Sequence, residues 1–216
     1  MTNQQRELLV QWLGEDRYII EDSSENDYCY CRRKKTLWEL SGGKNVIYWG
    51  SFSGTIAPSM KIGYILLPKD LSELWQKNRP YYSNRVSRIE QNTLAKFIDS
   101  GLYEQHVGYM RSIYREKMSA LVKAVSSSPL ASHTTLTGTD AGMFCLAEFD
   151  INAEEHTGKQ MLLHGGVKAS PLSSSIGKGE LSNYPPNTYV IGFGDLKISQ
   201  IHERIEKWAQ AWKKFL

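Results

Sequence analysis

The strongest evidence for the fold class is the sequence NVIYWGSFSGTIAPSMKIGYILLP, residues 45–68. Two nearly continuous apolar runs, residues 45–51 and 61–68, flank a loop rich in glycine, serine and proline. Such runs are typical of strands in a sheet that helices cover on both faces. Residues 17–22 (RYIIED) predict a third strand of the same kind, which ends in carboxylates. The three runs together predict an α/β sheet layer.

Helical patterns surround these strands. Residues 4–12 suit a short helix, and two helical stretches separated by Gly101 follow residue 68. The second, from residue 102 to about 125, carries one apolar stripe made of Tyr103, Val107, Met110, Tyr114, Met118, Leu121 and Val125. It predicts a long connecting helix.

The remaining residues predict a small α+β lobe. Strand-like runs occupy residues 141–150 and 188–194, and residues 152–166 read as a helix closed by glycines. A final amphipathic helix faces a core with a stripe at spacings of three and four: Ile198, Ile201, Ile205, Trp208, Trp212 and Phe215. Tryptophan and phenylalanine at this spacing favour core packing over cofactor contact.

Composition excludes several classes of protein. A chain of 216 residues can bury a substantial core, and its net charge of +3 is too weak to argue for nucleic acid. Apolar runs fall short of the roughly 18 residues that a membrane span needs, and the N-terminus shows no apolar signal core. We therefore expect a cytoplasmic protein without membrane contact. The basic run RRKK, residues 32–35, reads as a solvated loop in preference to a DNA contact.

The three cysteines make a poor disulfide framework, as expected in a reducing compartment. Cys29 and Cys31 could supply half of a metal site. Because no Cys/His pair follows at ligand spacing, reduced thiols without a metal are the favoured interpretation.

The candidate site lies where the strands end, since ligands of open α/β sheets bind beyond the carboxyl ends of strands. Asp22 could there hold a protonated ring nitrogen in its charged form. Ser51 and Ser53 could donate hydroxyls to a phosphate, with Lys61 adding a positive charge. The alternatives stay open: Asp22 caps a turn in residues 21–27, and the serines are ordinary loop polarity.

A family resemblance bears on this choice. Residues 17–28 (RYIIEDSSENDY), the stretch at 45–68, residues 81–117 and residues 191–205 together resemble MocR/GabR-type transcriptional regulators. These are fold-type I pyridoxal 5'-phosphate (PLP) proteins fused to a GntR-type winged helix. The resemblance is to the C-terminal part of their aminotransferase-like domain, and it covers the chain end to end. It implies a truncated fold-type I PLP-dependent transferase-like fold.

The resemblance also implies domain limits. Residues 1–85 correspond to the C-terminal part of the PLP-binding large domain, 86–128 to connecting helices, and 129–216 to the small C-terminal domain. It further implies a homodimer or a missing N-terminal half, which would include the winged helix and the aromatic residue that stacks on the cofactor ring. Any contact with DNA would belong to that half.

Carried over residue by residue, the resemblance implies that most of the cofactor chemistry is gone. Asp22 occupies the position that pairs with the pyridine nitrogen, and Ser24 replaces the tyrosine that binds the phenolic oxygen. Gly54 replaces the Schiff-base lysine, without which a transaminase has neither its covalent anchor nor its proton carrier.

The anion-binding positions are altered too. Ser51 and Ser53 keep hydroxyls near the phosphate, and Lys61 replaces the phosphate-binding arginine, which keeps the charge but loses the bidentate fork. Ser174 stands where the family has a substrate-carboxylate arginine. PLP binding is therefore expected to be weak or lost.

Three functions remain open at this point. The chain is a degenerate regulatory module that binds a small amino-acid-like effector, an active PLP-dependent aminotransferase that uses another lysine, or a fragment that binds nothing. Lys61 is the nearest amine to the loop, but its position is committed to phosphate. The absent lysine disfavours the active enzyme.

Overall fold

The computed structural model describes residues 1–14, 16–23, 26–31, 34–79, 83–152, 154–164, 166, 168–176 and 184–213. The chain divides into two compact units. The first comprises residues 1–27 and 32–108, and the second comprises residues 28–31 and 109–216. Ser24, Arg32 and Phe215, which the sequence singled out, lie outside the described residues.

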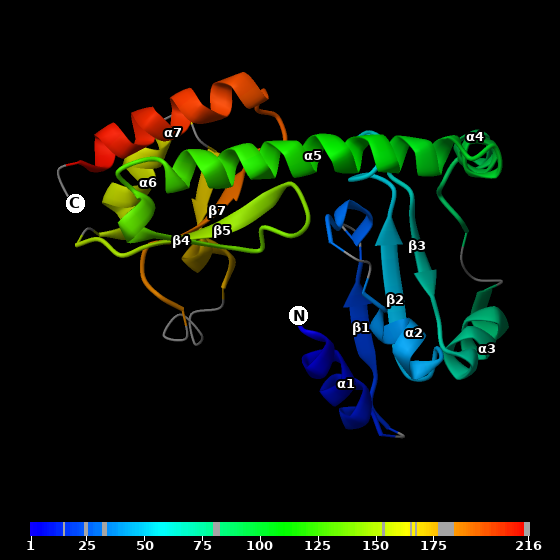
Figure 1. Cartoon of the computed structure of the whole chain (residues 1–216). Coiled ribbons are helices and arrows are strands. Elements are labelled where there is room, and N and C mark those ends of the chain that lie inside the picture. The colour runs from blue at the N-terminus through cyan, green and yellow to red at the C-terminus, as the bar shows by residue number, and fades with distance from the viewer. Residues whose placement is uncertain are drawn as a thin grey trace. The chain divides into compact units, whose positions relative to one another are not determined.

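The first unit is built on a three-stranded sheet of order β1-β2-β3 (Figure 1). Its strands are β1 (Ile19–Asp22), β2 (Val46–Ser51) and β3 (Gly63–Leu66), each within its predicted apolar run. β1 runs parallel to β2, and β3 runs antiparallel to it. The quoted stretch thus forms two paired strands joined by the candidate loop.

Helices α1 (Asn3–Trp12) and α2 (Leu37–Ser41) cover one face of this sheet. Their core consists of Leu13, Leu37 and Val46, all nearly inaccessible to solvent. Thr2 and Thr36 form capping boxes that satisfy the first backbone N–H groups of the two helices. This face was predicted correctly as buried.

The other face differs from the expected two-sided cover. Ile20 is 70% exposed, Trp49 is 45% exposed and Ile65 is 50% exposed. Trp49 pairs with Ile65 on β3 and with Asp22 on β1. Ile20 lies two residues before Asp22 on the same strand and therefore points to the same face. The side chains of Ile20, Trp49 and Ile65 thus share one face of the sheet. Within the described chain, helices do not bury this face as the apolar runs suggested.

Among the described residues three α-helices lie between β3 and β4 (Thr134–Thr137), where the sequence predicted two. They are α3 (Lys69–Asn78), α4 (Arg88–Asp99) and α5 (Leu102–Ser126). Pro68 ends the strand region and stands at the N-cap of α3. The predicted helical stretch between residue 68 and Gly101 is therefore two helices, α3 and α4. Gly101 adopts φ +74° between α4 and α5, a conformation that glycine reaches without strain. The predicted break at Gly101 is confirmed.

The second unit is an antiparallel sheet of order β4-β5-β7-β6 with helices on it (Figure 1). Its elements after α5 are β4 (Thr134–Thr137), β5 (Phe144–Phe149), α6 (Glu155–His164), β6 (Lys168–Pro171), β7 (Thr188–Gly192) and α7 (Ile198–Trp212). The sequence predicted β5, α6, β7 and α7; β4 and β6 were missed. Both are short strands at the edges of the sheet, so little apolar periodicity marks them.

The core of the second unit lies between the sheet and helices α5 and α7. Phe149 stacks on Trp212 with ring centroids 5.3 Å apart and meets Trp208 edge-on at 4.9 Å. The predicted stripes are confirmed at their centres, since Met118, Leu121, Ile201 and the two tryptophans are buried. Ile198 is an exception, because it is the first residue of α7 and is 39% exposed.

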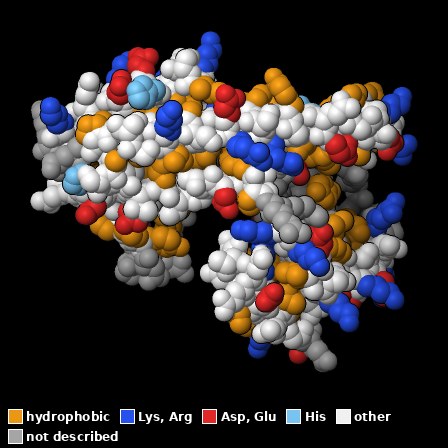
Figure 2. Space-filling model, viewed as in Figure 1, with side chains coloured by type: hydrophobic (Ala, Val, Ile, Leu, Met, Phe, Trp, Pro, Cys, Tyr) orange, Lys and Arg blue, Asp and Glu red, His pale blue; other side chains and the backbone are white. Residues whose placement is uncertain are grey.

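Positively and negatively charged side chains are mixed on the surface. Figure 2 shows basic and acidic side chains interspersed on the visible face, with hydrophobic side chains between them. This agrees with a net charge of only +3. Among the described residues, no helix combines the length and the hydrophobicity needed to cross a bilayer.

Candidate functional site

The loop between β2 and β3 is a closed, hydrogen-bonded turn. The amide of Phe52 donates to the carbonyl of Ile62 at 3.0 Å, which extends the β2–β3 pairing into the loop. The amide of Ile56 donates to the carbonyl of Phe52 at 2.9 Å, and that of Met60 to the carbonyl of Ala57 at 2.9 Å. The backbone of the loop is therefore fixed by its own bonds.

The two serines of the loop are engaged with the backbone. The hydroxyl of Ser53 donates to the carbonyl of Met60 at 2.5 Å, and the oxygen of Ser51 accepts from the amide of Ser53 at 3.2 Å. A hydroxyl has one proton to donate. Ser53 therefore keeps only acceptor capacity in this arrangement, whereas the proton of Ser51 is not used by these bonds. Gly54, which follows, is solvent-exposed and has no side chain.

A carboxylate at Asp27 ties this loop to α5. Its Oδ2 accepts the Tyr103 hydroxyl at 2.8 Å and the Thr55 hydroxyl at 3.2 Å. Thr55 is only 3% exposed, and its carbonyl lies 2.9 Å from Nε2 of His106. Burial raises the pKa of Tyr103, and the hydrogen bond to Asp27 adds to that shift. Tyr103 is thus a neutral donor at physiological pH.

Aromatic packing surrounds this anchor. Phe52 meets the ring of Tyr103 edge-on at 5.7 Å, and Phe97 of α4 does so at 6.4 Å. Tyr64 of β3 packs against Phe52 at 5.4 Å. A Cβ atom built on Gly50 would lie 2.3 Å from the Tyr64 ring, so the close approach of ring and strand requires glycine there.

Asp22 and Ser51 point to the same side of the sheet. Asp22 is the last residue of β1 and pairs with Trp49, which precedes Ser51 by two residues on β2. Asp22 is exposed at the carboxyl end of the strand, where the sequence placed it. The structure therefore brings these two candidate residues to one face and one end of the sheet.

The neighbouring carboxylate, Glu21, faces the other way and has a structural role. Its oxygens accept from the amides of Leu37 at 2.9 Å and Trp38 at 3.1 Å, at the N-terminus of α2. Arg6 lies 3.3 Å from the same carboxylate. An anion at a helix N-terminus stabilises the helix, so Glu21 fixes α2 on the sheet.

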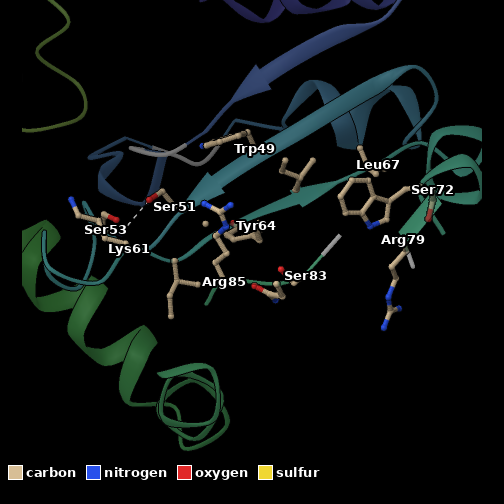
Figure 3. Close-up of a pocket in the computed structure, with 15 residues that line it drawn as sticks. Trp49, Ser51, Ser53, Lys61, Tyr64, Leu67, Ser72, Arg79, Ser83 and Arg85 are labelled. Carbon is tan, nitrogen blue, oxygen red and sulfur yellow. Dashed lines mark hydrogen bonds between the residues drawn. The ribbon is translucent and has the colours of Figure 1, made fainter. Parts of the chain in front are cut away.

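An open groove runs along the exposed face of β2 and β3. Its volume is about 1310 Å³. Figure 3 shows Ser51, Ser53 and Lys61 together at one end of the strands, and Ser72 and Arg79 at the other. The described lining residues include three cations, Lys61, Arg79 and Arg85, and no carboxylate. The apolar part of the lining comes from Trp49, Ile62, Tyr64, Ile65, Leu67 and Trp75.

The remaining predicted residue belongs to the second unit. Ser174 lies in a short 3-10 helix, Leu172–Ser175, and its hydroxyl donates to the carbonyl of Pro171 at 2.7 Å. Ser173 beside it donates to Glu155 at 2.6 Å. Both hydroxyls therefore satisfy groups of their own unit.

These side chains do not fit a covalently held PLP. The loop offers no amine at Gly54, and the Ser53 hydroxyl is spent on Met60. Ser51 and Lys61 fit an anion, and the apolar lining of the groove fits a flat organic group. The arrangement can therefore bind and orient an organic anion without a covalent bond. Among the described residues, no group of three or more His, Cys, Asp or Glu side chains could hold a metal ion.

Sequence reasoning missed the Asp27 anchor. Tyr103 was placed on the apolar stripe of α5, and His106 lies three residues after it. Residues three apart lie on the same face of a helix, so this spacing indicates that the apolar stripe begins with two polar groups, a tyrosine hydroxyl and a histidine ring. Nothing local linked them to Asp27 and Thr55, which lie 76 and 48 residues before Tyr103 in the chain.

The chain is similar in sequence to known transcriptional regulators. No protein-family model matches it. It is 32% identical over 216 residues to the HTH-type transcriptional regulator YdeL of Bacillus subtilis, covering 99% of this chain and 45% of that protein. YhdI of the same organism is 31% identical over 98% of this chain, and the regulatory protein MocR of Rhizobium meliloti is 28% identical over 91%.

Solved structures match the fold. The kynurenine aminotransferase of Pyrococcus horikoshii superposes with a TM-score of 0.86 at 20% identity, over 99% of this chain and 52% of that one. A multiple substrate aminotransferase from Thermococcus profundus gives 0.85 at 19% identity over the same shares. The chain thus spans about half the length of the proteins it matches. It has the fold of the corresponding part of a fold-type I aminotransferase, and it is related to HTH-type regulators of the MocR type, over 99% of its length to YdeL and over 91% to MocR.

Proposed function

We propose that this chain is the aminotransferase-like part of a MocR-type transcriptional regulator, and that it binds a small anionic effector without catalysing transamination. The observation that carries the proposal is the loop at residues 50–64. It has glycine at the position where the resemblance requires the Schiff-base lysine, and its backbone is fixed by internal hydrogen bonds.

The groove supports the choice of ligand. Lys61, Arg79 and Arg85 supply positive charge, and Trp49 and Trp75 supply apolar surface beside it. An amino-acid-like molecule or an aromatic phosphate offers the matching carboxylate or phosphate and a flat or apolar body. Asp22 shares the face of Trp49 and Ser51, so on this proposal a cationic group of the same ligand lies on the side of the sheet that carries this carboxylate.

The first test asks whether an adduct forms. Purified protein is titrated with PLP, reduced with borohydride and mapped by peptide mass. We expect no saturable adduct in residues 50–64 and no amino transfer to a ketoacid. Gly54→Lys alone is expected to leave turnover absent, because a lysine needs the rest of a pocket to act. A stoichiometric adduct on one lysine, with ketoacid-dependent bleaching, would show an active aminotransferase instead.

The second test asks whether the groove binds an anion. The probe is pyridoxamine 5'-phosphate, which cannot bond covalently to a lysine, measured by calorimetry at low salt. Lys61→Gln is expected to weaken binding about tenfold, because a hydrogen bond to a charged group contributes about 1.5 kcal/mol. Lys69→Gln makes the same charge change at a side chain that is 92% exposed and 3.9 Å from Glu73, and serves as the control. Equal effects of the two variants would contradict a site at Lys61.

Assembly follows from the open sheet. Within the described chain, β1 and β3 each pair with a single neighbour, and the face of Ile20, Trp49 and Ile65 is exposed. Unpaired edges and apolar faces promote association. We expect self-association, or pairing with sequence of the kind that the longer relatives possess. Sedimentation at tens of micromolar, roughly where exposed edges associate, tests this. A sharp monomer that melts in one cooperative step would contradict it.

A further inference from the structure

A pair of thiols lies in the segment of residues 28–31, which belongs to the second unit. The sulfur atoms of Cys29 and Cys31 are 3.0 Å apart. Cys31 is exposed and Cys29 is half-buried. A disulfide bond is about 2.05 Å long, so the two atoms stand about 1 Å from bonding distance.

Tertiary contacts hold this segment in place. Cys29 forms an antiparallel bridge with Ala141, and the amide of Tyr30 donates to the carbonyl of Asp140 at 2.8 Å. The amide of Gly142 donates to the carbonyl of Tyr28 at 3.0 Å, and the phenol of Tyr30 donates to the carbonyl of Gly142. The proximity of the thiols is therefore fixed by the turn at residues 140–142 as well as by their spacing in the sequence.

Side chains of α5 hold the same segment. The Arg115 guanidinium donates to the carbonyl of Tyr30 at 2.7 Å, between the two cysteines. Tyr28 packs edge-on against Tyr114 with ring centroids 4.9 Å apart and is 2% exposed. The residue before the thiol pair and the residue between the two thiols are thus anchored before any reaction takes place.

A metal does not account for the pair. Groups of three His, Cys, Asp or Glu side chains that could hold a metal ion are absent from the described residues. Preorganised thiols of which one is exposed are suited to thiol–disulfide exchange.

We propose that Cys29 and Cys31 form a reversible intramolecular disulfide by exchange with low-molecular-weight disulfides such as glutathione disulfide. The exposed Cys31 thiolate attacks one sulfur of glutathione disulfide, forms a mixed disulfide and releases one glutathione thiolate. The Cys29 thiolate then attacks the sulfur of Cys31 and displaces the second glutathione. The protein loses two electrons and two protons, and one glutathione disulfide becomes two glutathione molecules. A disulfide closed over one intervening residue is strained, which makes it easy to reduce again.

Cys145 serves as an internal reference in the test. It is 2% exposed, and burial raises the pKa of its thiol to about 12. The full chain is incubated with glutathione disulfide, quenched with acid, denatured and alkylated, and the products are mapped by mass. In the wild type we expect the loss of two of three alkylatable thiols, a Cys29–Cys31 peptide lighter by two hydrogen atoms, and full recovery with dithiothreitol.

Single variants separate closure from simple modification. Cys29→Ser is expected to keep glutathione on Cys31, because the resolving thiol is missing, whereas the wild type keeps none. Arg115→Gln leaves both thiols and removes one anchor, so the mixed disulfide is expected to persist longer than in the wild type. A wild type that retains glutathione on Cys31, or whose thiols do not react, would overturn the proposal. So would Cys29→Ser behaving like the wild type.

Discussion

Replacing Tyr103 by phenylalanine tests whether the Asp27 anchor holds the loop at residues 50–64. The substitution keeps the ring that packs on Phe52 and Phe97, and it removes the hydroxyl that donates to Asp27 at 2.8 Å. A hydrogen bond to a charged group contributes about 1.5–3 kcal/mol. Since about 1.4 kcal/mol changes an equilibrium tenfold, local opening of the loop should become about 10- to 100-fold more frequent.

Native-state hydrogen exchange with peptide mass analysis measures this opening. The relevant amides are those of Phe52 and Ile56, which donate within the loop at 3.0 and 2.9 Å. Tyr109→Phe is the matched control, because Tyr109 lies on the same helix and is 66% exposed. Unchanged exchange of the loop in Tyr103→Phe, or an equal change in the control, would refute the anchor.

Three further predictions concern stability. Gly50→Ala should destabilise the first unit, because the new Cβ would lie 2.3 Å from the Tyr64 ring. Urea unfolding is expected to show a lower midpoint. Adding Tyr64→Ala to the Gly50→Ala variant should restore part of the lost stability. Trp212→Ala should cost about 3–5 kcal/mol on urea unfolding, since the side chain is fully buried, whereas Trp12→Ala, 51% exposed, should cost little; similar losses would contradict the core assignment. Raising the pH should destabilise the fold, because burial raises the pKa of Tyr64 and of Tyr189 to about 12. Both phenols stay neutral in the folded protein at a pH where the same phenols ionise in the unfolded chain, which is near 10. The stability that they contribute is therefore fully present below pH 10 and is lost between about pH 10 and 12. Tyr189→Phe should flatten that alkaline loss, and an unchanged slope would speak against burial as its cause.

The sequence was informative wherever one element carries its own pattern. The apolar run of β2, the stripe of α7 around Trp208 and the break at Gly101 depend on hydrophobic period and backbone conformation, which act over a few residues. These features are local, so they could be predicted without knowing what they pack against. The missed edge strands β4 and β6 are short and only partly covered, and they gain their structure mainly from pairing with β5 and β7.

The candidate site divides in the same way. The sequence placed Asp22 at a strand end and Ser51, Ser53 and Lys61 in the loop after the next strand, and strand register then set Asp22 and Ser51 on one face. It could not show that Ser53 donates its proton to Met60, because that bond depends on how the loop turns back.

The strand–loop–strand unit at residues 45–68, the long helix after Gly101 and the absence of a lysine at position 54 could all be inferred from the amino-acid sequence. In contrast, the hydrogen bonds of Asp27 to Thr55 and Tyr103, and the support of Cys29 and Cys31 by the turn at residues 140–142, depend on how the chain folds in three dimensions. The difference arises because the spacing of apolar residues is a property of a short stretch of sequence and does not depend on the rest of the fold. A hydrogen bond between residues dozens of positions apart exists only after packing has excluded water and brought donor and acceptor within about 3 Å.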